Sequence, residues 1–184
     1  GQSRQATRCR KLSMALKKAF EPLDKTIHDI KAFHCGKPVM DEFLRRYAAK
    51  NAKLGLSKTW VLSESEASGK LAVAAYFTLA VQSVSPDDLH ASNLPRYPDP
   101  VTLIARLAVD STYQGKGLGS KTLLSALAQA VRIYHNGLPT YAVVLDVLDD
   151  EAMRFYEKFE FFKQLGAYTD KLYVPMAVLQ QIFE

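Results

Sequence analysis

Three glycines within five residues mark the stretch of this sequence whose residue types most clearly suit binding chemistry. The segment Gln114-Gly-Lys-Gly-Leu-Gly119 follows an almost unbroken apolar run, 101–109, and precedes a helical pattern. The first N–H groups of a helix have no partner inside it, and with the helix dipole they attract anions. Glycine lets a ligand approach the backbone without meeting a Cβ, and Lys116 adds a cation. The segment therefore suits a pyrophosphate.

Two common phosphate-binding loops do not fit these residues. A Walker loop ends in Gly-Lys-Ser/Thr, whereas Lys116 is followed by Gly117. A dinucleotide fingerprint needs G-x-G-x-x-G in an early βαβ unit, but G-K-G-L-G is one residue too short and follows strands that the pattern predicts to be antiparallel. A helix cap whose glycines serve only packing is the alternative at this point.

Hydrophobic periodicity indicates the elements that lead into the glycine segment. The pattern predicts a helix over 39–54, whose apolar residues at helical spacing are Met40, Phe43, Leu44, Tyr47 and Leu54. Strands are predicted over 59–63 and 70–84, joined as a hairpin, and a proline-rich loop over 85–100. The run 101–109 is apolar on both faces apart from Thr102 and Arg106, which is typical of a strand covered on both sides.

The elements after the glycines alternate between helix and strand. A helix ending near 137–139 buries Leu123, Leu127, Ala130, Val131 and Tyr134 along one face. The pattern then predicts a strand (140–147), a helix (149–159), two short strands (160–165 and 171–175) and a terminal helix (176–183). This order predicts the α/β (α+β) class, with a mixed, mostly antiparallel sheet flanked by helices.

Composition narrows the class of protein. The 184 residues are 48% hydrophobic and 23% charged, which predicts one folded domain over 21–184. The net charge of +5 permits a polyanionic partner without requiring one. Two cysteines fit neither a zinc site nor a disulfide framework and the four histidines have no metal spacing, so we expect a reducing cytoplasm and no metal. No apolar run approaches the ~18 residues of a membrane span, so we expect no integral membrane protein.

Residues 1–20 form a basic N-terminal extension with six Lys or Arg and no acid. Such a start is compatible with a transit peptide, a basic arm, or sequence upstream of a true start at Met14. The absence of Met at position 1 favours the last of these.

The glycine segment also resembles the Gln/Arg-x-x-Gly-x-Gly/Ala pyrophosphate loop of the GNAT N-acetyltransferases. Residues 104–110 resemble that family's splayed central strand, and 151–161 is similar to its A-x-x-x-Tyr-E-K-x-G-F helix. The resemblance implies the GNAT acyl-CoA N-acyltransferase fold, with acetyl-CoA as the acetyl donor. It further implies that acetyl-CoA contacts Leu107, Val109, Gln114, Gly115, Lys116, Gly117, Leu118 and Gly119.

The same resemblance gives Tyr156 a catalytic role. An amine attacks the thioester carbonyl, backbone N–H groups stabilise the oxyanion, and the leaving thiolate benefits from a proton donor. Tyr156 aligns with the tyrosine that acts as general acid in many relatives, and the alternative is a core tyrosine with its hydroxyl at the rim. Two positions depart from the family pattern. Asp149 stands where many relatives have a cofactor-binding Asn, which leaves that contact open, and Glu160 stands in place of Gly.

A wider resemblance points to one branch of the family. Residues 33–62, with Phe-x-Cys-Gly and a Phe-Leu helix, and the strand 74–80 resemble the GNAT toxins of bacterial type II toxin–antitoxin systems. The resemblance implies acetylation of the α-amine of an aminoacyl-tRNA, which blocks translation. It also implies neutralisation by a ribbon-helix-helix antitoxin, contact with operator DNA only through the antitoxin complex, a homodimer and a cytoplasmic location.

Several side chains have candidate roles toward such a substrate. The candidates for tRNA contact are Arg46, Lys50, Lys53 and Arg106, although a charge stripe is more often a solvated helix face. A lone cation in an apolar strand, Arg106 must face a cavity, a partner or a ligand phosphate. Cys35 is expected to be a small buried hydrophobe and not a nucleophile. Two other functions stay open: a GNAT enzyme for a small amine or protein N-terminus, and a CoA-fold subunit of a DNA-bound regulatory complex.

Overall fold

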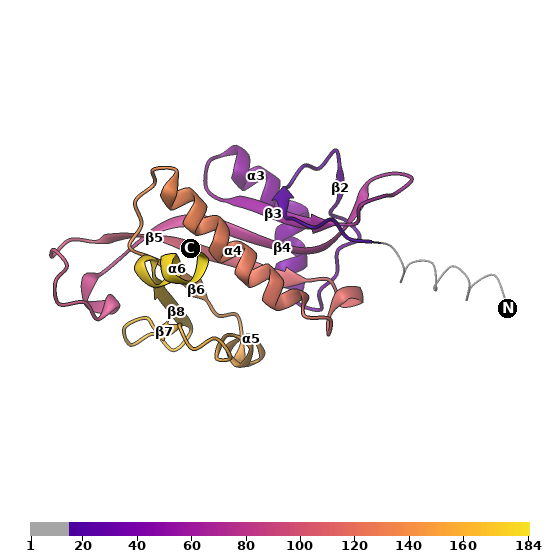
Figure 1. Ribbon diagram of the computed structural model, residues 1–184. Helices are drawn as coiled ribbons and strands as arrows, with labels where there is room; N and C mark the ends of the chain where they lie inside the picture. Colours follow the sequence, from indigo (N-terminus) through magenta and orange to yellow (C-terminus); the bar gives the residue numbers. More distant parts are fainter. Residues whose placement is uncertain (1–14) are drawn as a thin grey trace.

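The computed structural model describes residues 15–184, so residues 1–14 of the basic extension, including Cys9 and Met14, lie outside the described residues. One mixed sheet of eight strands forms the centre of this part (Figure 1). Its spatial order is β1-β3-β4-β5-β6-β8-β7, and β2 pairs with β4 off this path. The strands are β1 (Glu21–Pro22), β2 (His28–Asp29), β3 (Lys58–Ser63), β4 (Leu71–Val84), β5 (Asp99–Val109), β6 (Ala142–Asp146), β7 (Lys163–Gln164) and β8 (Lys171–Pro175).

The sheet is mostly antiparallel, as the sequence predicts. Within the described residues, β5 and β6 are parallel neighbours along the main path, and the short β2 lies parallel to the start of β4. The other pairs, including the β3–β4 hairpin and the long β4–β5 pair, are antiparallel. The sequence pattern did not indicate β1 or β2, because two-residue strands carry no detectable alternation.

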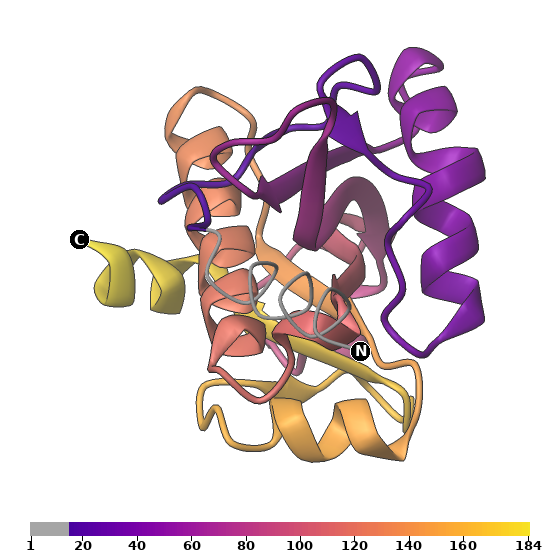
Figure 2. The same ribbon diagram turned by 90° about the vertical axis from the view of Figure 1, so that its right-hand side faces the viewer.

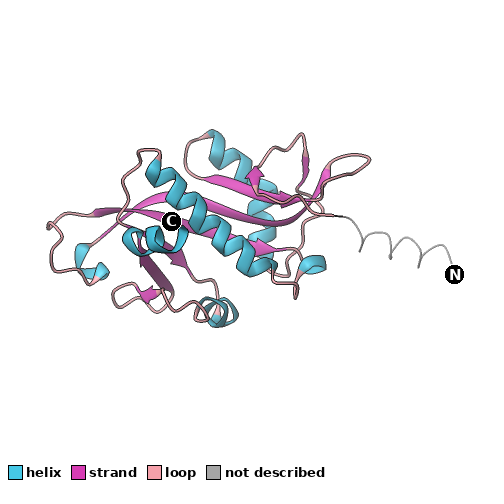
Figure 3. Ribbon diagram, viewed as in Figure 1, coloured by secondary structure: helices cyan, strands magenta, loops and turns pink. Residues whose placement is uncertain are grey.

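Helices cover both faces of the strands (Figure 3). They are α2 (Pro38–Glu42), the π-helical turn η1 (Phe43–Tyr47), α3 (Ala48–Lys53), α4 (Leu118–His135), α5 (Asp150–Tyr156) and α6 (Met176–Phe183). Short 3₁₀ turns, η2 (Pro86–Leu89) and η3 (Ser111–Tyr113), lie in the loops before and after β5. Figure 2 shows α4 and the continuous stretch α2–η1–α3 on opposite sides of the strands. No helix among residues 15–184 combines the length and apolar character needed to cross a membrane.

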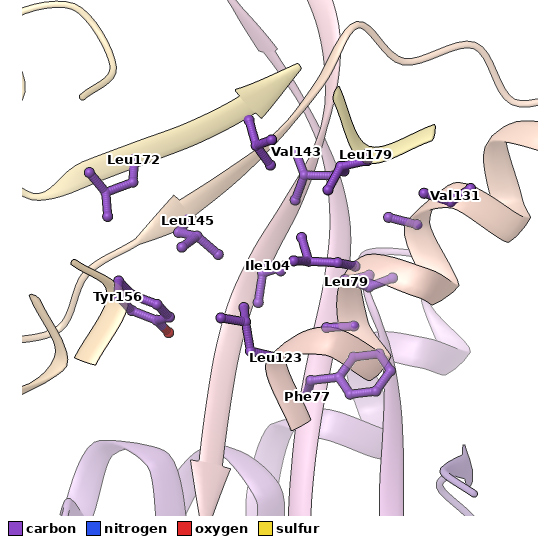
Figure 4. Packing of buried hydrophobic residues seen from close by; sticks show 14 of the residues in the cluster. Phe77, Leu79, Ile104, Leu123, Val131, Val143, Leu145, Tyr156, Leu172 and Leu179 are labelled. Carbon is purple, nitrogen blue, oxygen red and sulfur yellow. The ribbon is translucent and has the colours of Figure 1, made fainter. Parts of the chain in front are cut away.

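Alternation along the strands places apolar side chains on both faces of the sheet, and the two largest buried clusters among the described residues lie on opposite sides. On the α2–η1–α3 side, Phe33, Phe43 and Leu44 pack with Val61 and Tyr76. On the other side α4, α5 and α6 close over a larger cluster (Figure 4), which contains Phe77, Ile104, Leu123, Leu127, Val143, Leu145, Tyr156 and Leu179. The neighbours Tyr76 and Phe77 point to opposite faces of β4, as the two-residue period of a strand requires.

Some predicted details were wrong. Tyr47 and Leu54 are 45% and 62% exposed, although the helical pattern placed them on the buried face. The π-turn uses i→i+5 hydrogen bonds, so the residues after Phe43 rotate away from a 3.6-residue period, and the helix ends at Lys53, one residue before Leu54. Tyr134 is only partly buried. The helix predicted over 149–159 ends at Tyr156, and turns then shorten the next strand to β7.

Candidate active site

The centre of the sheet opens where two parallel strands separate. The pairing of β5 with β6 covers only Val101–Ile104 on β5. Beyond Ile104 the strand β5 continues to Val109 beside β4 alone, and a bulge at this point leaves Ala105 without a partner in the β4 register. A pocket of about 730 Å³ fills this opening, and residues 104–109 form one of its walls. The structure therefore contains the splayed central strand that the resemblance implied.

The glycine segment forms a second wall of this pocket. Gly115 and Gly117 have φ angles of +78° and +76°, in the left-handed region that glycine adopts without strain. Gly117 caps α4 without a side chain, so the first N–H groups of the helix have no capping side chain, and the residues that carry them, Leu118, Gly119 and Ser120, line the pocket. These amides and the positive end of the 18-residue helix form a site for an anion.

The flanking residues of the segment have different surroundings. The Gln114 amide Nε2 donates to the carbonyl of Cys35 (2.9 Å) and to that of Val109 (2.8 Å). It thereby ties the loop to the end of β5 and to the chain before α2, a positioning contact that the sequence pattern did not indicate. The Lys116 ammonium lies 6.0 Å from the centre of the Tyr113 ring, and Lys116 does not line the pocket. Leu107 and Val109 line it from β5.

Tyr156 brings its hydroxyl to the same pocket from α5. Its side chain is 6% exposed, lines the pocket and packs in the larger apolar cluster, where its ring points from α5 toward Leu123 (Figure 4). Burial raises the pKa of Tyr156 to about 12, because desolvation disfavours the phenolate. The hydroxyl has no hydrogen-bond partner within residues 15–184, so it remains protonated and able to donate to a bound molecule.

Asp149 caps α5 and bridges the mouth of the pocket. One carboxylate oxygen accepts the Ala152 N–H (2.9 Å), and the other lies 2.8 Å from the Lys37 ammonium. Lys37 also contacts Glu151 at 3.0 Å. Hydrogen bonds to Asp149 and then Glu151 raise the pKa of Lys37 to about 12, and Lys37 in turn lowers the pKa of Asp149. The sequence pattern did not indicate this bridge between the chain before α2 and the start of α5.

The four candidate cations fall into two groups. Arg106 lines the pocket, its guanidinium lies 4.8 Å from the Phe43 ring centre, and its Nη1 donates to the Ala105 carbonyl at 2.8 Å. Of the three alternatives for this lone cation, a cavity, a partner or a ligand phosphate, the structure shows it beside a cavity. Its Nε is buried without a partner in the described chain. Arg46, Lys50 and Lys53 are all exposed on η1 and α3, and Arg46 pairs with Glu42 at 3.3 Å.

Cys35 is 8% exposed at the pocket wall, and desolvation raises the pKa of its thiol to about 11. The nucleophile is the thiolate, so this thiol is largely inert at neutral pH, as expected for a structural cysteine. We predict that Cys35→Ala retains acetyl transfer within about twofold. Alkylation of the Cys35 peptide, followed by mass spectrometry, should remain slow at pH 8 and accelerate toward pH 11. Rapid labelling at pH 7 would contradict this assignment.

The sequence of this chain is similar to those of known proteins. The profile described as "Acetyltransferase (GNAT) domain" matches residues 59–162, more than half of the chain. The chain belongs to the GNAT acetyltransferase family. This chain is also 35% identical over 135 residues to the tRNA-acetylating toxin of Mycobacterium tuberculosis. The matched residues make up 72% of this chain and 78% of the relative.

Solved structures share the fold of this GNAT chain at low sequence identity. A Tyr-to-Phe mutant of KacT superposes with a TM-score of 0.81 at 20% identity, covering 91% of this chain and 99% of KacT. AtaT complexed with acetyl-methionyl-tRNAfMet gives 0.78 at 20% identity, with 92% and 100% covered. A Tyr-to-Phe mutant of the AtaT toxin, bound to the C-terminus of the antitoxin AtaR and acetyl-CoA, gives 0.76 at 19% identity, with 91% and 98% covered.

Proposed function

We propose that this protein transfers the acetyl group of acetyl-CoA to the α-amine of the amino acid on a charged tRNA, and thereby blocks translation. The observation that carries the acetyl transfer is one pocket in which the free amides of α4 and the buried Tyr156 hydroxyl meet at the splayed strand. The choice of acceptor is supported by the 35% identical relative, a tRNA-acetylating toxin.

Each group of pocket residues would have a separate role in the proposed reaction. The diphosphate of acetyl-CoA would bind the first N–H groups of α4, with Gly115 and Gly117 leaving the backbone accessible. The thioester would lie along β5, where a backbone N–H on its open edge stabilises the oxyanion. The neutral amine attacks, the C–N bond forms as the C–S bond breaks, and Tyr156 gives its proton to the leaving thiolate. The proton that the acetylated nitrogen loses then restores the Tyr156 hydroxyl, directly or through water. The acceptor would enter beside Met40 and Arg106, which line the pocket from α2 and β5.

The toxin interpretation extends to partners. A ribbon-helix-helix antitoxin would neutralise the enzyme, and operator DNA would be reached through that complex. The AtaT structure bound to part of its antitoxin, in a protein of the same fold, supports this assignment. The active form would be a cytoplasmic homodimer.

Label from acetyl-CoA distinguishes the candidate acceptors. The protein is incubated with labelled acetyl-CoA and charged tRNAs, deacylated tRNAs, a polyamine panel or peptides with free N-termini. We expect label on charged tRNA alone, released with the amino acid on mild alkaline hydrolysis. Label only on polyamines or peptides would show a different GNAT enzyme, and absence of transfer to every acceptor would favour a non-catalytic CoA-fold subunit.

A further inference from the structure

A second pocket, of about 610 Å³, lies apart from the glycine segment. Four cationic side chains line it: Lys25, Lys31, Arg45 and Lys70. They come from three separate parts of the chain, namely the region around β2, the π-turn η1 and the residue before β4. We call this set the basic pocket. The sequence pattern did not indicate it, because its members are up to 45 positions apart (Lys25 to Lys70) and share no helical or strand period.

The described residues leave the four cations of the basic pocket without ion-pair partners. Among residues 15–184, none of its four cations forms an ion pair. The one acid in its wall, Asp29, accepts the N–H groups of Lys31 (3.1 Å) and Ala32 (3.3 Å) through a single oxygen. Several like charges around a concave surface repel one another and concentrate anions from solution.

The wall between the cations is rigidly held. His28 is 1% exposed, and its Nδ1 accepts the Asp24 N–H at 3.0 Å. Its Nε2 lies 2.8 Å from the Glu21 carboxylate and, because Nδ1 accepts, is the nitrogen that donates. The parallel β2–β4 pair fixes the same wall to the sheet. Lys25, Lys31 and Lys70 lie in turns and bends, and these contacts fix the segment between Lys25 and Lys31 to the sheet.

The basic pocket lies close to the acceptor side of the active-site pocket. Lys31 lines the basic pocket and Cys35 lines the active-site pocket, and four residues of chain span at most about 14 Å. A second connection runs along the continuous stretch α2–η1, where Met40 lines the active-site pocket and Arg45 lines the basic pocket. In Figure 2 the indigo segment after β2 runs beside the purple helices toward the start of α2.

We infer that the basic pocket binds the phosphodiester backbone of the tRNA next to its acceptor end. This inference rests on the proposed function, which places the aminoacyl end of the tRNA beside Met40 and Arg106. Lys31, Arg45 and Lys70 then neutralise phosphates just outside the active-site pocket. The stripe formed by Arg46 on η1 and by Lys50 and Lys53 on α3 is a weaker candidate, because Arg46 is already paired with Glu42.

The test is tRNA affinity as a function of salt. The triple variant K31A/R45A/K70A is compared with R96A/R132A/K163A, which removes the same charge from exposed positions outside both pockets. Binding of deacylated tRNA is measured by filter retention between 50 and 200 mM KCl. We expect the basic-pocket variant to bind at least about tenfold more weakly at 100 mM, with a salt slope smaller by about two to three. The control should stay near wild type. Calorimetry with CoA shows whether both variants keep a native active-site pocket.

The possible outcomes distinguish a failure of the basic-pocket inference from a failure of the proposed function. Wild-type protein that acetylates charged tRNA while the basic-pocket variant keeps the wild-type Kd and salt slope would overturn the inference and leave the proposed function intact. An equal loss in both variants would also overturn it. Wild-type protein that binds tRNA through these cations but transfers no acetyl group to charged tRNA would support the basic pocket and refute the proposed function alone.

Discussion

Tyr156→Phe is expected to lower kcat for acetyl transfer by about 10²–10⁴-fold while leaving the KM for acetyl-CoA nearly unchanged. In the proposed reaction the thiolate would leave into the pocket that the buried Tyr156 lines, and burial raises the pKa of this group to about 12. The proton would therefore be present at every working pH and would be transferred only as the C–S bond breaks. Steady-state kinetics with a saturating charged tRNA measure the effect.

The loss of activity in Tyr156→Phe should come from the missing proton donor and not from a destabilised fold. The hydroxyl has no hydrogen-bond partner in the described chain, so its removal leaves no buried group unsatisfied and should not lower the melting temperature. Tyr134→Phe is the matched control, since Tyr134 is partly buried against the same apolar cluster and does not line the pocket. A wild-type kcat for Tyr156→Phe would return this residue to the alternative role of a core tyrosine.

The sequence pattern was sufficient to predict those parts of the structure that depend on residues close together in the chain. The strand over 101–109 and the helix after Gly117 follow from local apolar periodicity, and so does the hairpin before them. The glycine segment is likewise local, because positive φ angles and a bare helix start involve consecutive residues. These features place the amides of α4 at the end of the central strand. The sequence predicted this placement.

Features that depend on contacts between distant segments were not predictable in the same way. The Lys37–Glu151 contact joins residues 114 positions apart, and the basic pocket draws on three segments. Nothing in the residues around Lys37 distinguishes it from a solvated lysine. The π-turn at Phe43–Tyr47 is local, yet it has no periodic signature, and it moved Tyr47 from the predicted core to the surface.

Gly117→Ala is expected to weaken CoA binding at least about tenfold, or about 1.4 kcal/mol. Gly117 lines the pocket with φ +76°, and an added Cβ would meet no atom within 4 Å among the described residues other than its neighbours along the chain. The methyl group would therefore occupy space through which the diphosphate approaches the amides of α4. The left-handed backbone adds a strain of about 1–2 kcal/mol for a residue with a Cβ. Calorimetric titration with CoA measures the loss of affinity.

Gly55→Ala is a control that distinguishes backbone strain from blocked approach of the diphosphate to the amides of α4. Gly55 has φ +75°, an equally open surrounding and a position after α3, outside both pockets. It should cost similar folding stability and leave CoA affinity unchanged. Gly117→Asn completes the comparison, because Asn tolerates the left-handed region better than Ala but brings more bulk. If Gly117→Asn binds CoA like the wild type, close approach of the diphosphate to the backbone at this position is not what requires the glycine. If both Gly117 variants lose affinity while Gly55→Ala keeps it, the missing side chain at the start of α4 is what admits the ligand.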